Sequence, residues 1–261
     1  AATGSLTSIN LAGNNLYAEG AKALVDGGAF SASLTSVGIL SNKFDTETAT
    51  MLLKVKEEHP TLKTLCGFTH GETELDLSNR GLGPADAMLI APELGDIRSL
   101  TSINLQDNEL CGLNYQGRGT YTAEGILALS EAIRVSDSLT SLNISFNSLV
   151  GETGWINSYH PASEVKGEGR DIKMFDLSGV QMLATAIAVN RSLTSLDLKH
   201  NNLRAEGAKA LVDGGAFKGS LTSLDLSWNE LEAEAAKALA SAIRFGGSLT
   251  SINLSQNDLL R

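Results

Sequence analysis

The chain has 261 residues, of which 42% are hydrophobic and only 5% aromatic, and its formal net charge at pH 7 is −10. Lys and Arg form no run that would neutralise a series of phosphates, so neither nucleic acid nor an anionic membrane surface is expected as partner. No apolar stretch reaches the roughly 18 residues of a membrane helix, and no basic-then-apolar segment stands at Ala1, so we expect neither a membrane anchor nor a signal peptide in this sequence. We therefore expect a basic or polar protein ligand.

The first 30 residues predict a short strand followed by a helix. Ile9 and Leu11 alternate with polar residues, as in a strand with one buried face, and Ala18 to Asp26 is rich in helix formers. The wording A-E-G-A-K-A-L-V-D-G-G-A-F of residues 18–30 returns unchanged at 205–217. Such duplication argues against a unique active site in either copy.

The same unit recurs in the form L-x-x-L-x-L-x-x-N-x-L, as in residues 193–203. Its Asn stands at positions 14, 42, 108, 147, 201, 229 and 257, and Arg80 takes that place in one further unit. The spacings are 28, 38, 28, 39, 54, 28 and 28, which is one period of 28 with insertions of 10, 11 and 26 residues. The pattern predicts an α/β solenoid, with about eight parallel strands in one concave sheet and helices on the convex side.

The repeated Asn is expected to bind backbone groups where the chain turns out of the sheet, which makes a ladder from repeat to repeat. Arg80 cannot do this in the same way, so the ladder should be interrupted there. Helix starts are also predicted: Asp45 as an N-cap, Pro84 in a first turn, Thr122 as a cap, and Ser178 with Gln181 as a capping box.

Three insertions interrupt the period, at about 66–75, 111–121 and 150–176. We interpret the first as a loop where a helix returns to a strand. The other two both enter between the N-x-L turn and the helix, so they should project from one rim and lie near each other.

We interpret residues 1–261 as a single domain. The chain starts without Met and ends before an eighth helix, with no polar capping unit at either end, so we expect it to be a segment of a longer protein. Cys66 and Cys111 stand in different repeats and give no disulfide framework, which predicts a reducing, cytoplasmic location.

The wording S-L-T-S-[LI]-[DN]-L-x-x-N-x-L followed by A-E-G-A-K-A-L resembles the ribonuclease-inhibitor-like class of leucine-rich-repeat proteins. That class includes the repeat regions of NOD-like receptors and of Ran GTPase-activating proteins, and the wording is also similar to uncharacterised repeat proteins of algae and protists. The resemblance covers nearly the whole chain outside the insertions and implies a horseshoe. It implies little about function, because members inhibit, sense or scaffold through different surface residues.

The sequence contains no recognisable metal-binding or phosphate-binding motif. The four His and two Cys have no metal-ligand spacing, and the Gly-rich pieces lack the Lys-Ser/Thr ending of a phosphate loop. Arg118 lies between glycines, and we interpret it as a solvated loop residue rather than a charge-stabilising finger. We expect no catalytic, cofactor or metal site, and hence a non-enzymatic protein-protein interaction scaffold or a subunit of an assembly. The alternatives are a GTPase regulator of the Ran-activating type and the ligand-sensing region of a NOD-like receptor.

One column of variable positions stands out on the predicted concave face. Between the strand leucines the residues are small and polar, but two positions beyond the second leucine three adjacent repeats carry Phe146, His200 and Trp228, with Lys199 beside them. We hypothesise that these four residues, here called the aromatic corner, bind the partner together with aromatic residues of the longest insertion, namely Trp155, Tyr159 and His160. The alternative is that the insertion covers Phe146 and Trp228 within the molecule.

Overall fold

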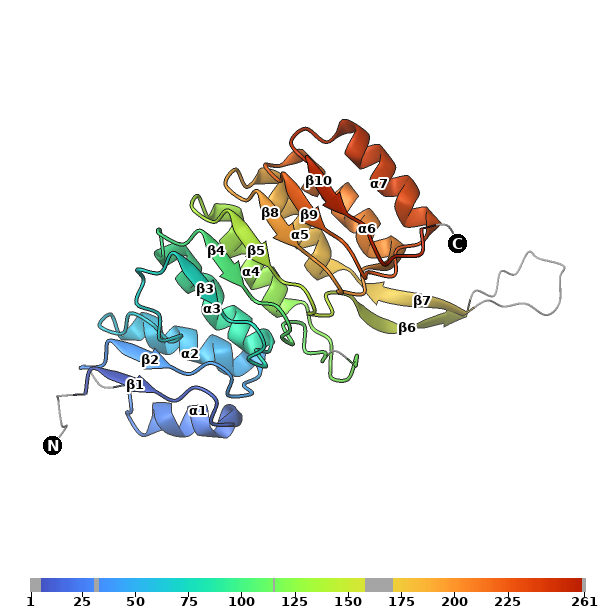
Figure 1. Ribbon diagram of the computed structural model, residues 1–261. Helices are drawn as coiled ribbons and strands as arrows, with labels where there is room; N and C mark the ends of the chain where they lie inside the picture. Colours follow the sequence, from blue (N-terminus) through green and yellow to red (C-terminus); the bar gives the residue numbers. More distant parts are fainter. Residues whose placement is uncertain (1–5, 31–32, 115, 158–170, 260–261) are drawn as a thin grey trace.

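The structure is a computed structural model that describes residues 6–30, 33–114, 116–157 and 171–259. Its elements alternate along the chain, with one hairpin inserted (Figure 1). In order they are β1 (Ser8–Asn10), α1 (Tyr17–Asp26), β2 (Ser36–Gly38), α2 (Thr46–Glu58), β3 (Glu74–Asp76), α3 (Pro84–Asp96), β4 (Ser102–Asn104), α4 (Glu124–Val135), β5 (Ser141–Asn143), β6 (Gly151–Asn157), β7 (Asp171–Asp176), α5 (Ser178–Val189), β8 (Ser195–Asp197), α6 (Arg204–Asp213), the 3₁₀ turn η1 (Ala216–Lys218), β9 (Ser223–Asp225), α7 (Ala233–Phe245) and β10 (Ser251–Asn253).

The strands of the repeats form one layer and the helices the other (Figure 1). Within β5, Leu142 is buried between the half-exposed Ser141 and Asn143, as period two predicts. The leucines of one repeat, Leu193, Leu196, Leu198 and Leu203, are at most 2% exposed. From α3 to α7, each helix packs against the next. The described chain is therefore an α/β solenoid of strand-helix units.

The predicted Asn ladder is present. Asn201 is fully buried, and its Nδ2 donates to the carbonyl oxygens of Ile144 and Leu198, each at 3.0 Å. The backbone N–H of Asn147 donates to Oδ1 of Asn201 at 2.8 Å, and the N–H of Asn201 donates to Oδ1 of Asn229 at 2.8 Å. Each Asn thus holds its own turn and ties its repeat to the next.

Arg80 interrupts the ladder, as expected from the sequence. Its backbone N–H still donates to Oδ1 of Asn108, but its guanidinium turns back and donates to the carbonyl oxygen of Asp76 at 2.8 Å. On the other side, the N–H of Ser41 donates to Oδ1 of the buried Asp86 at 2.7 Å. Gly13 holds the same position in the first repeat as Ser41 in the second, one residue before the ladder Asn. The N–H of Gly13 donates to a backbone carbonyl oxygen, that of Leu40. A carboxylate therefore replaces a backbone acceptor where the ladder stops.

The expectation of one sheet of eight strands is wrong. The eight strands are present, but β3, β4, β5, β8, β9 and β10 form a six-stranded parallel sheet, and β1 and β2 form a separate pair. Ser36 and Gly38 of β2 bridge to Thr64 and Cys66, one period of 28 residues further on. Gly67 then adopts φ +77° and leads into the first insertion. Residues 64–66 thus take the place beside β2 that β3 would otherwise occupy, and β2 and β3 do not pair with each other.

A buried carboxylate holds the helical layer to this break. Glu93 of α3 is fully buried and accepts hydrogen bonds from Oγ1 of Thr64 and the N–H of Leu65, both at 2.6 Å. Nζ of Lys56 in α2 lies 3.3 Å from the same carboxylate. Because α2 also packs against α3, the helices continue across the gap in the sheet.

The predicted helix starts are confirmed in part. Oδ1 of Asp45 accepts the N–H of Thr48 at 2.8 Å, and this bonding lowers the pKa of Asp45, while Pro84 opens α3. Oγ1 of Thr122 accepts the N–H of Glu124 at 3.3 Å, but Thr122 lies one residue before the N-cap position of α4, which Ala123 occupies. The prediction of a capping box with Ser178 at the N-cap is wrong. Ser178 is the first residue of α5, and its N–H and Oγ both donate to Oδ1 of Asp176.

The longest insertion is a hairpin at its base, which the sequence pattern does not predict. Strands β6 and β7 pair antiparallel from Gly151 with Asp176 to Asn157 with Asp171, with an irregularity between Glu152 and Gly154. The hairpin projects away from the repeat array (Figure 1).

We expect Asn201→Ala to lower the free energy of unfolding by on the order of 3 kcal/mol, because it leaves several buried backbone groups without a partner. The matched control is Asn14→Ala, since the exposed Asn14 belongs to the first repeat and its side chain binds only within its own turn. Urea denaturation followed by circular dichroism measures both variants. Equal midpoints for the two would show that the ladder contributes little.

Candidate functional site

Every repeat places the residue before the ladder position in the left-handed backbone region. At these eight positions φ lies between +52° and +71°, at Gly13, Ser41, Asn79, Asp107, Phe146, His200, Trp228 and Gln256. Gly and Asn adopt this conformation at least cost, whereas bulky side chains do so rarely. Three adjacent repeats nevertheless carry large rings here.

The three rings stack along the solenoid. The ring centroids of Phe146 and His200 are 4.5 Å apart with planes 9° from parallel, and those of His200 and Trp228 are 6.4 Å apart at 29°. Nζ of Lys199 lies 5.7 Å from the centroid of Phe146, within cation–π range. Phe146 and His200 are half-buried, and Trp228 is 48% exposed. The structure therefore brings all four residues of the aromatic corner together.

The remaining predicted site residues lie in the longest insertion. Trp155 belongs to β6, but its side chain is outside the described part of the structure. Tyr159 and His160 lie outside the described residues altogether.

The small polar residues of the concave face have a structural role that the sequence did not reveal. Oδ1 of Asp197 accepts the N–H of Lys199 at 2.9 Å, two residues ahead. The same bond to the residue two positions ahead is made by the carboxylate or amide oxygens of Asn10, Asp76, Asn104, Asn143, Asp225 and Asn253. These side chains start the turn that leads to the left-handed residue. Burial, with the nearby Asp225, raises the pKa of Asp197.

The second and third insertions meet on one rim, as predicted. Oη of Tyr121 donates to the carbonyl oxygen of Leu149 at 2.9 Å. Gly151 passes so close to the Tyr121 ring that a Cβ there would lie 2.1 Å from Cγ. Burial is the main cause that raises the pKa of Tyr121, so the phenol keeps its proton. The contact depends on a glycine at position 151.

Arg204 ties the hairpin to the repeats. Its guanidinium lies 3.0 Å from the carboxylate of Glu152 in β6 and 3.0 Å from that of Glu230 in the next repeat. It also stacks over Phe175 of β7, with 4.9 Å from Cζ to the ring centroid. The sequence held one signal for it: the two identical copies at 18–30 and 205–217 are preceded by different residues, Tyr17 and Arg204.

Two hollows border the aromatic corner. The first, of about 580 Å³, lies between the two insertions and the repeats and includes Tyr121, Glu152, Phe175, His200, Asn202, Arg204 and Glu230 in its lining. The second, of about 530 Å³, is lined by His200, Asn202, Trp228, Glu230, Glu232, Gln256, Asn257 and Asp258. They share His200, Asn202 and Glu230, so together they form one groove, here called the rim groove.

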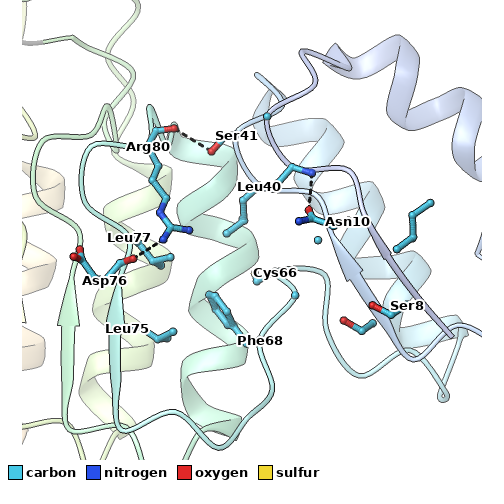
Figure 2. Close-up of a pocket in the computed structure, with 16 residues that line it drawn as sticks. Ser8, Asn10, Leu40, Ser41, Cys66, Phe68, Leu75, Asp76, Leu77 and Arg80 are labelled. Carbon is cyan, nitrogen blue, oxygen red and sulfur yellow. Dashed lines mark hydrogen bonds between the residues drawn. The ribbon is translucent and has the colours of Figure 1, made fainter.

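A further hollow of about 760 Å³ occupies the break in the sheet. Figure 2 shows Phe68, Leu75 and Leu77 in its lining and Arg80 bound to Asp76. Oγ of Ser41 donates to the carbonyl oxygen of Arg80 at 3.0 Å. The two charged residues in the described lining of this hollow, Asp76 and Arg80, are therefore hydrogen-bonded to each other at the edge of the six-stranded sheet.

Two observations concern metal ligands and thiols among the described residues. Within them, no group of three His, Cys, Asp or Glu side chains is placed to hold a metal ion. Both Cys66 and Cys111 are free, and burial raises the pKa of both thiols, to about 12 for Cys111. Such thiols are protonated at neutral pH and react slowly. In the same part of the chain, no helix has the length and apolar character to cross a membrane.

We expect Gly151→Ala to displace the Tyr121 ring, break its bond to Leu149 and lower the free energy of unfolding by about 1–3 kcal/mol, as overpacking does. Gly247→Ala is the control, because a Cβ at Gly247 meets no atom within 4 Å. Thermal unfolding and hydrogen exchange at the bases of both insertions provide the measurement. The two insertions do not pack as described if both variants unfold at the same temperature.

A family model agrees with the repeat pattern in three stretches of the chain. Residues 5–25, 189–212 and 220–240 match the family model described as Leucine Rich repeat. No curated protein matches the chain. Among solved structures, the leucine-rich repeat-containing protein LegL7 from Legionella pneumophila is similar at 18% identity, over 95% of this chain and 82% of that one, with a TM-score of 0.38. TLR13, in its complex with ssRNA13, is similar at 16% identity and a TM-score of 0.31, over 98% of this chain and 37% of that one. The chain thus contains leucine-rich repeats, which the family model locates in its first repeat and in two of its last.

Proposed function

We propose that the protein is a non-enzymatic protein-protein interaction module that recognises its partner through the aromatic corner. Leucine-rich repeats build extended concave surfaces that suit this role. The partner then contacts the exposed edge of the ring stack and the adjoining rim groove.

The observation that carries the proposal is a stack of rings at backbone positions that disfavour them. A left-handed conformation costs a residue other than Gly about 1–2 kcal/mol. Ring stacking returns about 0.5–1.5 kcal/mol per pair, which offsets this cost but leaves a large indole partly in water. Trp228 is 48% exposed, and aromatic residues of this kind provide much of the binding energy at interfaces.

The charges near the corner support a protein partner rather than a nucleic acid. Glu230, Glu232 and Asp258 line the hollow beside Trp228. Carboxylates repel a phosphate backbone, and the formal charge of the whole chain is −10. Lys199 lies over Phe146, where its ammonium group serves the ring stack.

We expect Trp228→Ala to weaken binding of the natural partner at least tenfold, as removal of an interface hot spot does. Tyr17→Ala is a matched control, because Tyr17 is also a half-exposed aromatic residue with positive φ, but at the far end of the array. Quantitative mass spectrometry of the proteins captured by the unsubstituted chain, Trp228→Ala and Tyr17→Ala identifies the partner. Titration of the purified partner with each of these three proteins then gives the affinities.

The role of Trp228 is structural instead if Trp228→Ala lowers the unfolding temperature and leaves the affinity unchanged. The proposal also fails if Tyr17→Ala and Trp228→Ala weaken binding equally.

A further inference from the structure

The rim groove runs beside the aromatic corner and has two parts with different contents. In the first part, the guanidinium of Arg204 occupies the space between the hairpin and the repeats. The second part extends from Asn202 past Trp228 to Gln256. The groove thus offers one part filled by the chain's own arginine and one part that lies open beside an exposed indole.

The groove carries an excess of negative charge. Among the described residues that line it, four are carboxylates, Glu152, Glu230, Glu232 and Asp258, and one, Arg204, carries a guanidinium. Arg204 already pairs with Glu152 and Glu230 in the first part. Of the described residues that line the second part, none is Lys or Arg. A cationic group from a partner is therefore complementary in charge to the second part.

The first part shows how this surface binds a guanidinium. Arg204 lies over the ring of Phe175 and contacts two carboxylates at 3.0 Å each. The second part offers the same two kinds of group, an aromatic face on Trp228 and carboxylates on Glu230 and Glu232. A planar guanidinium stacks on an indole and pairs with carboxylates at its edge, which a compact ammonium group does less well.

We propose that the second part of the rim groove binds an arginine side chain of an extended segment of the protein partner, with the guanidinium against Trp228 and the carboxylate of Glu232. This inference rests on the proposed function and specifies the chemistry of the partner. His200 and Asn202 line both parts, so the segment continues from there toward the hairpin.

The probe is a capped Gly-Arg-Gly-Arg-Gly peptide, titrated into the ¹⁵N-labelled protein. Trp155 and Trp228 give the two indole N–H signals, which Trp155→Phe assigns. We expect the Trp228 signal to shift with the arginine peptide, to shift much less with a lysine peptide, and to stay in place with a citrulline peptide, which keeps the shape but not the charge. Raising the salt concentration should weaken the binding.

Glu232→Gln tests the carboxylate, and we expect it to weaken peptide binding roughly three- to fivefold, as expected for a partly exposed ion pair. Glu232 precedes α7 without a side-chain capping bond, so the substitution removes no cap. Glu234→Gln is the matched control, because it removes the same charge two residues away, from a side chain that pairs with Lys237 and does not line the groove.

Three results would overturn the inference. They are equal shifts with the citrulline and arginine peptides, equal weakening by Glu232→Gln and Glu234→Gln, or a shift of the Trp228 signal with a single-stranded oligouridine. If any of these occurs while Trp228→Ala still weakens binding of the natural partner, the arginine chemistry is wrong and the proposed function stands. If Trp228→Ala has no effect on the partner either, both are wrong.

Discussion

Each repeat must turn its chain out of the strand at the same point, and the buried Asn of the ladder fixes that turn. Asn201 holds backbone groups of its own repeat and of the one before it, while the next Asn accepts its N–H. The turn also fixes the left-handed residue that precedes the Asn. Side chains at that position must then lie above one another, whatever length of chain separates them. Phe146 and His200 stack although the longest insertion stands between them.

The break in the sheet shows what the chain needs where this ladder is missing. Between β2 and β3, ionisable side chains bind backbone groups that a neighbouring repeat otherwise serves. Asp86 accepts the N–H of Ser41, Glu93 accepts the N–H of Leu65, and the guanidinium of Arg80 donates to the carbonyl of Asp76. Burial raises the pKa of Asp86. A buried carboxylate is costly unless it is hydrogen-bonded, so its presence here reflects the N–H groups that need an acceptor.

The period made much of the fold predictable, because it assigns each residue number a place in space. The strand positions, the ladder, its interruption at Arg80 and the neighbouring rings of the aromatic corner all follow from it. The broken sheet did not follow, since residues 64–66 and β3 fit the same place and only packing decides between them. The hairpin was also missed, because the Gly-rich wording near Gly151 shows no clear alternation. Within the candidate site, the ring stack was predictable, but the contacts of Arg204 depend on how the hairpin folds.

The two identical copies show where a regular solenoid can vary. Tyr17 and Arg204 immediately precede the two identical sequences 18–30 and 205–217, and their φ angles are +51° and +55°. Each meets a side chain of the following repeat: Nζ of Lys43 lies 5.8 Å from the Tyr17 ring centroid, and Arg204 pairs with Glu230. The backbone conformation is kept while a cation–π contact is replaced by an ion pair, so the rim presents Lys43 beside β2 and the carboxylate of Glu230 beside β9. Because the backbone is held by the Asn and Leu positions, such exchanges change the surface without changing the fold. The surface of the chain therefore differs from repeat to repeat at the few positions that the repeat leaves free.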